Sequence, residues 1–313
     1  MTRAFVFPGQ GSQAVGMGRE LAEAFPIARQ LFQEVDDALS QKLSALMFEG
    51  PEADLTLTEN AQPALMAMSL AVVRVLETEG GIDLARTAAF VAGHSLGEYS
   101  ALAAAGAFTV ADTARLLKIR GQAMQKAVPV GIGAMAALLG SELEQAKEIA
   151  AVAAEGDVCE AANDNGGAQV VLSGHKVAVD RAIKLAAERG IKRAILLPVS
   201  APFHCALMQP AADAMEAALA KVDMKSPRLP LVANVTANRV TDPDEIRALL
   251  VRQVTGTVRW RECVLFMKAQ GVDTLVELGV GKVLGGLAKR IDKELSGSSV
   301  GTPADIEAFL KTL

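Results

Sequence analysis

Short β-rich runs alternate along this chain with longer stretches rich in alanine and leucine, and this alternation most constrains the fold. It is typical of α/β proteins, in which helices cover the faces of a sheet. Residues 18–77 are mostly helical in pattern, with breaks predicted at Gly50-Pro51 and near Pro63. The tail at 296–299 is predicted to be a loop before a short final helix. Strands are predicted over residues 4–7, 88–92, 195–198, 230–233 and 274–277.

The segment from about residue 128 to residue 193 differs from its surroundings. It holds an apolar run at 134–139, a helical stretch at 142–154, the polar sequence Asn163-Asp164-Asn165-Gly166-Gly167, a second apolar run and a second helical stretch. With the strand predicted next, the order is β-α-β-turn-β-α-β, a split β-α-β unit of about 65 residues. We predict a small subdomain over 128–196, inserted into a larger domain made of 1–127 and 197–313.

The composition excludes several classes of protein. The chain has 313 residues, 51% of them apolar, which is enough to bury a large core and excludes a disordered chain. Its net charge is −5, so it lacks the excess of basic residues that is typical of nucleic-acid-binding proteins. No apolar stretch approaches the roughly 18 consecutive residues that a membrane span needs, and the first residues lack a signal-peptide pattern. We therefore expect a soluble, cytoplasmic protein without nucleic-acid or membrane partners. We also expect a monomer.

The counts of cysteine and histidine exclude further kinds of site. The cysteines Cys159, Cys205 and Cys263 are odd in number and widely spaced, so neither a disulfide framework nor a Cys-x-x-Cys site is available. We expect buried thiols. With only three histidines in the chain, a three-histidine metal site is not expected.

The strongest local motif is Gly93-His94-Ser95-Leu96-Gly97, which fits Gly-x-Ser-x-Gly. It follows a predicted strand and precedes the helix-prone residues 98–105. On such a turn the serine is exposed at a helix N-terminus, and the next backbone N–H points toward an oxyanion. The motif indicates a nucleophilic Ser95, and a purely structural turn is the alternative.

A nucleophilic serine needs a base, because its free hydroxyl is barely reactive at neutral pH. His204, just past a predicted strand end, is the leading candidate. His94 is expected to point away from the reaction and to be structural, since neighbouring side chains in an extended strand face opposite sides. His175 is expected at the surface of the small subdomain.

Two glycine-rich segments, 9–14 and 131–136, match the looser dinucleotide-binding pattern Gly-x-Gly-x-x-Ala. The first is not followed by a second strand ending in an acidic residue, and the second runs into a strand. Nucleotide binding is therefore not favoured. No Gly-x-x-x-x-Gly-Lys-Ser/Thr sequence is present, which excludes a P-loop.

Together the motifs resemble those of the malonyl-CoA:acyl carrier protein transacylases, nearly from end to end. Segments 5–13 and 93–99 look like the family's opening glycine loop and its nucleophile segment. Five further segments follow the family's order, at 60–64, 120–125, 198–204, 253–260 and 277–284.

The resemblance implies a large α/β-hydrolase-like domain with an inserted small ferredoxin-like subdomain, and an active site between them. It implies that Ser95 is the acylated nucleophile and His204 its base. The backbone N–H groups of Gln10 and Leu96 would form the oxyanion hole. Gln253 matches the position whose backbone carbonyl orients the histidine, in place of the acid of a Ser-His-Asp triad.

The same resemblance identifies Arg120 as the residue that binds the substrate carboxylate. A malonyl group ends in a carboxylate that would be costly to bury unpaired, and a guanidinium can hold it with two hydrogen bonds. Phe203 resembles the malonyl-type form in which a phenylalanine limits the substrate pocket. Pro202 departs from the alanine often found there in modular synthases.

The function implied is transfer of the malonyl group from malonyl-CoA to the phosphopantetheine thiol of acyl carrier protein, through a malonyl-serine intermediate, to supply fatty acid elongation. No cofactor is needed. The alternatives are an acyltransferase of a polyketide or polyunsaturated fatty acid synthase, a serine thioesterase or editing hydrolase, and a non-catalytic carrier-binding module. Arg120 argues against a hydrolase unless its substrate is also an acid.

Carrier docking calls for a positive patch, because acyl carrier proteins are typically acidic and this chain is itself negative. The densest basic set lies on and after the second helix of the small subdomain, where Lys192 and Arg193 are the predicted carrier contacts. Clusters of this kind are often only solvated surface. The set comprises Lys176, Arg181, Lys184, Arg189, Lys192 and Arg193.

Overall fold

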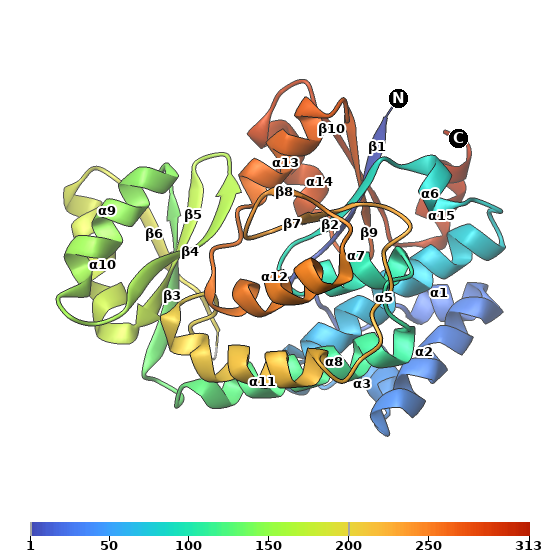
Figure 1. The fold of residues 1–313 in the computed structure, drawn as a ribbon, viewed down its shortest axis with the longest axis horizontal. Coiled ribbons are helices and arrows are strands. Elements are labelled where there is room, and N and C mark those ends of the chain that lie inside the picture. The colour runs from blue at the N-terminus through green and yellow to red at the C-terminus, as the bar shows by residue number, and fades with distance from the viewer. Residues whose placement is uncertain (1, 200) are drawn as a thin grey trace.

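A computed structural model describes residues 2–199 and 201–313, and the fold is mixed α/β with two sheets (Figure 1). In these residues a six-stranded sheet has the order β10-β9-β1-β2-β7-β8. All neighbouring strands of this sheet are parallel except β8, which pairs antiparallel with β7. The strands are β1 (Arg3–Phe7), β2 (Phe90–Gly93), β7 (Leu231–Ala233), β8 (Asn238–Val240), β9 (Thr274–Leu278) and β10 (Ser296–Val300).

Both faces of this sheet are covered, which explains why its central strands are apolar without interruption. Phe5 and Phe7 of β1 pack into the larger core, and Ala4 and Val6 pack into a second core on the other face. The larger core is formed mainly with α2 (Pro26–Leu39), α5 (Thr58–Thr78), α7 (Gly97–Ala104), α8 (Val110–Ala127), α11 (Gln209–Leu219) and α12 (Pro243–Thr255). The second core is formed with α13 (Trp260–Ala269) and α14 (Val283–Ile291).

Shorter helices complete this part of the chain. They are α1 (Arg19–Ala24), α3 (Leu43–Glu49), α4 (Glu52–Thr56), α6 (Leu84–Thr87), the 3-10 helix η1 (Ala206–Met208) and α15 (Pro303–Leu310). None of the helices in the described ranges is long and apolar enough to cross a membrane.

The second sheet is antiparallel, has the order β4-β5-β3-β6 and lies at one end of the molecule (Figure 1). Its elements follow the predicted β-α-β-turn-β-α-β order. They are β3 (Gly133–Leu139), α9 (Leu143–Ala154), β4 (Cys159–Gly166), β5 (Gln169–His175), α10 (Lys176–Glu188) and β6 (Arg193–Leu196). Helices α9 and α10 form a separate core with one face of the sheet.

The small sheet is joined to the larger part of the protein by backbone hydrogen bonds as well as by the chain. Val258 N donates to Ala162 O at 2.8 Å, and Asp164 N donates to Val258 O at 2.9 Å. Arg261 adds an ion pair with Asp164 at 2.8 Å. These contacts join β4 to the segment that leads into α13.

Two sequence-based predictions of local structure are wrong. α5 continues through Pro63 although the proline removes one backbone hydrogen bond in the second turn, because the helix is almost entirely buried and tertiary packing stabilises it. Residues 296–299 belong to β10, the edge strand beside β9, although serine and glycine favour strands poorly. A Cβ on Gly297 would lie 2.0 Å from Gly285 O in α14, so helix packing explains the glycine there.

The predicted strands are present, with ends that differ by up to two residues. β2 begins two residues later than predicted and includes Gly93, and β6 runs two residues earlier, over Arg193–Leu196. Ser200, in the segment before His204, lies outside the described residues.

Candidate active site

The motif at 93–97 forms a sharp turn from β2 into α7, with Ser95 at its apex, so the predicted strand-turn-helix context is confirmed. Ser95 has a φ of 55°, in the left-handed region that L-residues rarely adopt. A Cβ on Gly93 would lie 1.9 Å from the carbonyl carbon of Gly97, and a Cβ on Gly97 would lie 2.3 Å from Phe7 O. Close backbone approach therefore requires both glycines.

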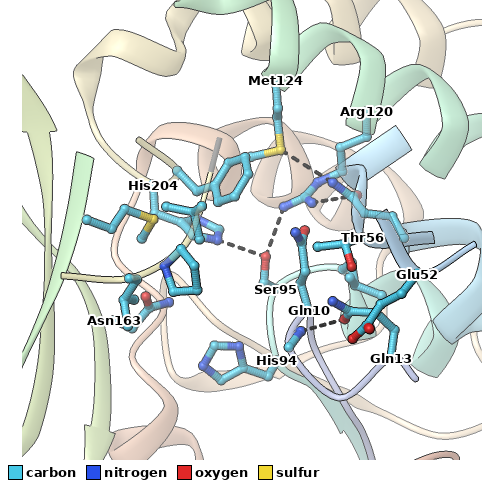
Figure 2. A pocket seen from close by; sticks show the side chains of 18 residues that line it. Gln10, Gln13, Glu52, Thr56, His94, Ser95, Arg120, Met124, Asn163 and His204 are labelled. Carbon is cyan, nitrogen blue, oxygen red and sulfur yellow. Dashed lines mark hydrogen bonds between the residues drawn. The ribbon is translucent and has the colours of Figure 1, made fainter. Parts of the chain in front are cut away.

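The structure brings His204 to this serine (Figure 2). Its Nε2 lies 2.8 Å from Ser95 Oγ, and its Nδ1 lies 2.8 Å from the backbone carbonyl oxygen of Gln253. Because a carbonyl oxygen only accepts, Nδ1 carries the proton of the neutral ring and Nε2 accepts from the serine. Burial, and then the charge of Arg120, lower the pKa of His204 to about 3, so the ring is neutral at pH 7.

Arg120 reaches the same serine from α8 and is 1% exposed. Its Nη2 donates to Ser95 Oγ at 3.1 Å and to Gln253 Oε1 at 2.9 Å. Its Nη1 donates to Gln62 Oε1 at 2.8 Å. Within the described residues the guanidinium forms hydrogen bonds only to neutral oxygens and no ion pair. The site therefore presents a buried cation to an anionic group.

Gly121 explains how α8 comes so close to α5. A Cβ at this position would lie 2.5 Å from the Cα of Glu59 and 2.7 Å from the carbonyl oxygen of Thr58. The backbones of the two helices therefore touch one residue beyond Arg120. This contact places Arg120 next to Gln62, on the second turn of α5.

Three buried polar side chains, those of Gln253, Asn234 and Glu98, connect the turn at Ser95 to the elements around it. Gln253 Nε2 donates to the Ser95 carbonyl oxygen at 2.9 Å and to the carboxylate of Glu98. Asn234 Oδ1 accepts from Ser95 N at 2.8 Å, and Asn234 Nδ2 donates to Gly93 O at 2.8 Å. Burial raises the pKa of Glu98 to about 8.

The two predicted oxyanion donors flank the serine. Leu96 follows it at the start of α7, and Gln10 lies in the loop after β1. Neither backbone N–H has a hydrogen-bond partner elsewhere in the described chain. Both residues line the same cavity as Ser95.

This cavity, of about 490 Å³, lies between the two sheets. Phe203 lines it next to the reacting groups, and Met135 and Asn163 contribute its wall from the second sheet. A second cavity of about 480 Å³ shares Gln10, Gly11, His94, Asn163 and Leu197 with the first and extends to Lys282 and Arg290 at α14. The cleft therefore continues from Ser95 to two cations.

The remaining histidines take no part in the Ser95 contact. His94 lines both cavities, and its Nε2 lies 2.8 Å from Asn165 Oδ1, so its ring bridges the two sheets instead of facing away from the cleft. The strand ends at Gly93, so strand alternation does not govern its direction. His175 is half-buried, and its Nδ1 accepts from Val158 N at 3.0 Å. The cysteines are buried and free, as predicted.

The basic set of the small sheet is only partly available to a partner. Lys176 pairs with Asp180 at 2.7 Å, Arg181 pairs with Asp157 at 2.8 Å, and Arg189 lies 3.7 Å from Glu148. Lys192 and Arg193 are exposed and form no ion pair with another described residue. They stand at the start of β6, which leads to the cavity wall at Leu197.

Four residues of this site were not identified from the sequence: Thr58, Gln62, Glu98 and Asn234. Gln62 offered a signal, because a glutamine inside a long apolar helix must find a partner when buried. Glu98 offered the same signal within the apolar start of α7. The sequence around Asn234 carries no such mark.

Comparison with known proteins identifies close relatives. The family model described as acyl transferase domain matches residues 4–290. The chain is 46% identical to malonyl CoA-acyl carrier protein transacylase of Bacillus subtilis (strain 168), with 99% of this chain and 96% of that protein covered. It is 47% identical to the protein of the same name from Escherichia coli (strain K12), with 98% of each covered.

Solved structures agree with these matches. An acyl-carrier-protein-S-malonyltransferase from Bartonella henselae is 58% identical and superposes with a TM-score of 0.97, covering 100% of this chain and 99% of the other. A malonyl-transacylase solved in complex with a type II PKS acyl-carrier protein is 43% identical, with a TM-score of 0.96 and 100% of both chains covered.

Proposed function

Because this chain belongs to the malonyl CoA-acyl carrier protein transacylases, we propose that it transfers malonyl groups from malonyl-CoA to the phosphopantetheine thiol of an acyl carrier protein. The observation that carries this function is the position of the Ser95 hydroxyl. It lies 2.8 Å from a neutral imidazole and 3.1 Å from a buried guanidinium that has no ion-pair partner among the residues described by the structure. A base, His204, and a cation that can bind a carboxylate, Arg120, thus both contact the nucleophile Ser95.

In the first half-reaction the malonyl carboxylate binds Arg120, and Ser95 Oγ attacks the thioester carbonyl. His204 Nε2 takes the hydroxyl proton as the new C–O bond forms, and the N–H groups of Gln10 and Leu96 stabilise the oxyanion. The tetrahedral intermediate collapses by breaking its C–S bond. The proton on His204 passes to the departing sulfur, so free CoA and malonyl-Ser95 result.

The second half-reaction reverses these steps with a different thiol. The phosphopantetheine thiol gives its proton to His204 Nε2 and attacks malonyl-Ser95 at the ester carbonyl. When the C–O bond breaks, His204 returns the proton to Ser95 Oγ. Because Nδ1 stays bonded to the Gln253 carbonyl throughout, the ring keeps its orientation while Nε2 carries the proton in both directions.

The second cavity suits the pantetheine arm that both substrates share. It opens from the first cavity at His94 and ends near Lys282 and Arg290, two cations that match the phosphates of CoA or of the carrier's prosthetic group. We place the arm along this cleft, with its thiol end at Ser95. No cofactor is required for either half-reaction.

The carrier would dock next to this cleft, on the exposed pair Lys192 and Arg193. Their lack of ion-pair partners within the described residues supports this assignment, because an acidic carrier would not compete with a bound carboxylate. Lys176, Arg181 and Arg189 are poorer contacts, since each already has an acidic neighbour.

We also propose the finer domain description. The two sheets and their separate cores support a division into an α/β-hydrolase-like domain, residues 1–127 and 197–313, and a ferredoxin-like subdomain, residues 128–196. We further propose that the enzyme acts as a cytoplasmic monomer that supplies fatty acid elongation. The 43%-identical relative bound to a type II PKS carrier makes polyketide synthesis the second candidate.

The test is incubation of the protein with radiolabelled malonyl-CoA, with and without a pantetheinylated carrier. Without carrier, label is expected on Ser95 of the denatured protein, and with carrier it is expected on the carrier thiol. Ser95→Ala should retain no label. Release of free malonate as the main product would identify a hydrolase, and label on another residue of Ser95→Ala would refute the assigned nucleophile. Fatty acid and polyketide carriers compared in parallel separate the two pathways.

A further inference from the structure

Buried side chains connect the carboxylate-binding arginine to the loop that carries one oxyanion donor. Arg120 Nη1 donates to Gln62 Oε1 at 2.8 Å, and Gln62 Nε2 donates to Thr58 Oγ1 at 3.0 Å. Thr58 Oγ1 in turn donates to Gln10 Oε1 at 2.8 Å. The chain of three hydrogen bonds therefore begins at a cation and ends on the side chain of Gln10, whose backbone N–H is one of the two proposed oxyanion donors.

The charge of Arg120 sets the direction of every bond in this chain. A guanidinium only donates, so Gln62 must turn its carbonyl oxygen toward Arg120 and its NH₂ group toward Thr58. Thr58 Oγ1 then accepts from Gln62, and its single proton is directed to Gln10 Oε1. Reversal of any one member would leave two donors or two acceptors facing each other inside the protein.

Burial distinguishes the other three members of this chain from Gln10. Arg120, Gln62 and Thr58 are each 1% exposed, whereas Gln10 is exposed in the loop after β1. Thr58 is the one hydrogen-bond partner of the Gln10 side chain in the described part of the protein. The hydroxyl of Thr58 therefore links the buried hydrogen-bond network to the exposed side chain of Gln10.

We propose that Thr58 is a positioning residue that couples the carboxylate site to the oxyanion hole, an inference that rests on the proposed function. Through Gln62, the fixed guanidinium orients the Thr58 hydroxyl, and the hydroxyl holds Gln10 where its backbone N–H meets the developing oxyanion. Oxyanion donors act only when they are held at the correct distance before the reaction. Arg120 thereby contributes to the rate as well as to substrate binding.

The test compares Thr58→Val, which keeps the side-chain shape and removes the hydroxyl, with Thr58→Ser, which keeps the hydroxyl. Thr113→Val is the matched control, because Thr113 is a fully buried threonine on α8 whose hydroxyl, among the described residues, bonds only to the backbone oxygen of Thr109. In single-turnover acylation with malonyl-CoA, Thr58→Val should lower the maximal rate about tenfold and change the half-saturating concentration less than about threefold. Thr58→Ser should recover most of the rate, and Thr113→Val should leave it unchanged.

A second readout does not depend on activity. In crystal structures of the variants, the backbone of residues 9–11 should be displaced or have raised B-factors in Thr58→Val and stay unchanged in Thr58→Ser and Thr113→Val. An unchanged backbone there in Thr58→Val, a loss confined to substrate affinity, or equal rate losses in Thr58→Val and Thr113→Val would each overturn the proposal. Failure of the unmodified protein to form malonyl-serine would instead refute the proposed function, and the coupling with it.

Discussion

Replacement of Arg120 by alanine is expected to weaken the preference of the enzyme for malonyl over acetyl groups. The guanidinium is buried, forms no ion pair among the described residues and lies against Ser95, so it favours a substrate that brings a carboxylate. A neutral acetyl group leaves this cation without a counter-charge in a low-dielectric site. Arg120→Ala removes the favourable ion pair with the malonyl carboxylate. It also removes the cost of leaving a buried cation unpaired when an acetyl group is bound.

The magnitude follows from the kind of interaction that is lost. A charge-assisted, two-bond pair between a guanidinium and a carboxylate typically costs about 2 to 5 kcal/mol to remove. At about 1.4 kcal/mol per tenfold, kcat/KM for malonyl-CoA should fall by a factor of about 30 to several thousand. The substitution also leaves the side-chain oxygens of Gln62 and Gln253 without their donor. The loss of these two hydrogen bonds lowers kcat/KM for malonyl-CoA and for acetyl-CoA alike, so its effect cancels in the ratio of the two values.

The assay is single-turnover formation of acyl-enzyme from malonyl-CoA and from acetyl-CoA under identical conditions. The malonyl-to-acetyl ratio should change by at least about tenfold in Arg120→Ala. Arg115→Ala, an exposed arginine on the same helix that pairs with Asp112, should leave the ratio unchanged. An unaltered ratio in Arg120→Ala, or an equal change in Arg115→Ala, would refute the assignment of Arg120 as the carboxylate-binding group.

His204→Ala should slow acylation by roughly two to four powers of ten with the fold intact, since a positioned base is lost, and circular dichroism and single-turnover kinetics check both points. Glu98 binds a proton in the folded protein between pH 4.5 and about 8 that the unfolded chain has released, so this group lowers the free energy of unfolding as pH rises through that window. Glu98→Gln should remove that part of the slope in urea denaturation at a series of pH values. Reversal of Lys192 and Arg193 to glutamate should weaken transfer to carrier, lower its salt dependence and leave transfer to free pantetheine nearly unchanged.

Three outcomes contradict these expectations. Near-normal acylation by His204→Ala together with loss in His94→Ala would move the base to the other histidine. An identical pH dependence of stability in Glu98→Gln and the unmodified protein would place the proton elsewhere. Equal losses with carrier and free pantetheine after reversal of Lys192 and Arg193 would indicate damage to the cleft instead of a docking surface.

The parts of the site that could be predicted from sequence are those that local structure determines. Ser95 was found because two glycines and the flanking strand and helix together specify one sharp turn. His204 could be selected because the chain offers only three histidines. The order of elements in the small sheet followed from hydrophobic pattern and turn residues alone.

The remaining parts depend on contacts between elements distant in sequence. Gln62 meets Arg120 because α8 crosses α5 at Gly121, and no local pattern predicts that crossing. The strand β10 was missed for a similar reason: its serines and glycine take strand form because β9 pairs with them and α14 packs closely on them.

Both reacting residues adopt a left-handed backbone conformation that side-chain-bearing residues disfavour, with φ of 55° at Ser95 and 59° at His204. Such conformations cost on the order of 1 kcal/mol each for residues other than glycine. Glycine would relax either position, yet it would also delete the reacting group. The native state therefore gives up some stability to keep the enzyme active, and any gain in thermal resistance has to come from other positions.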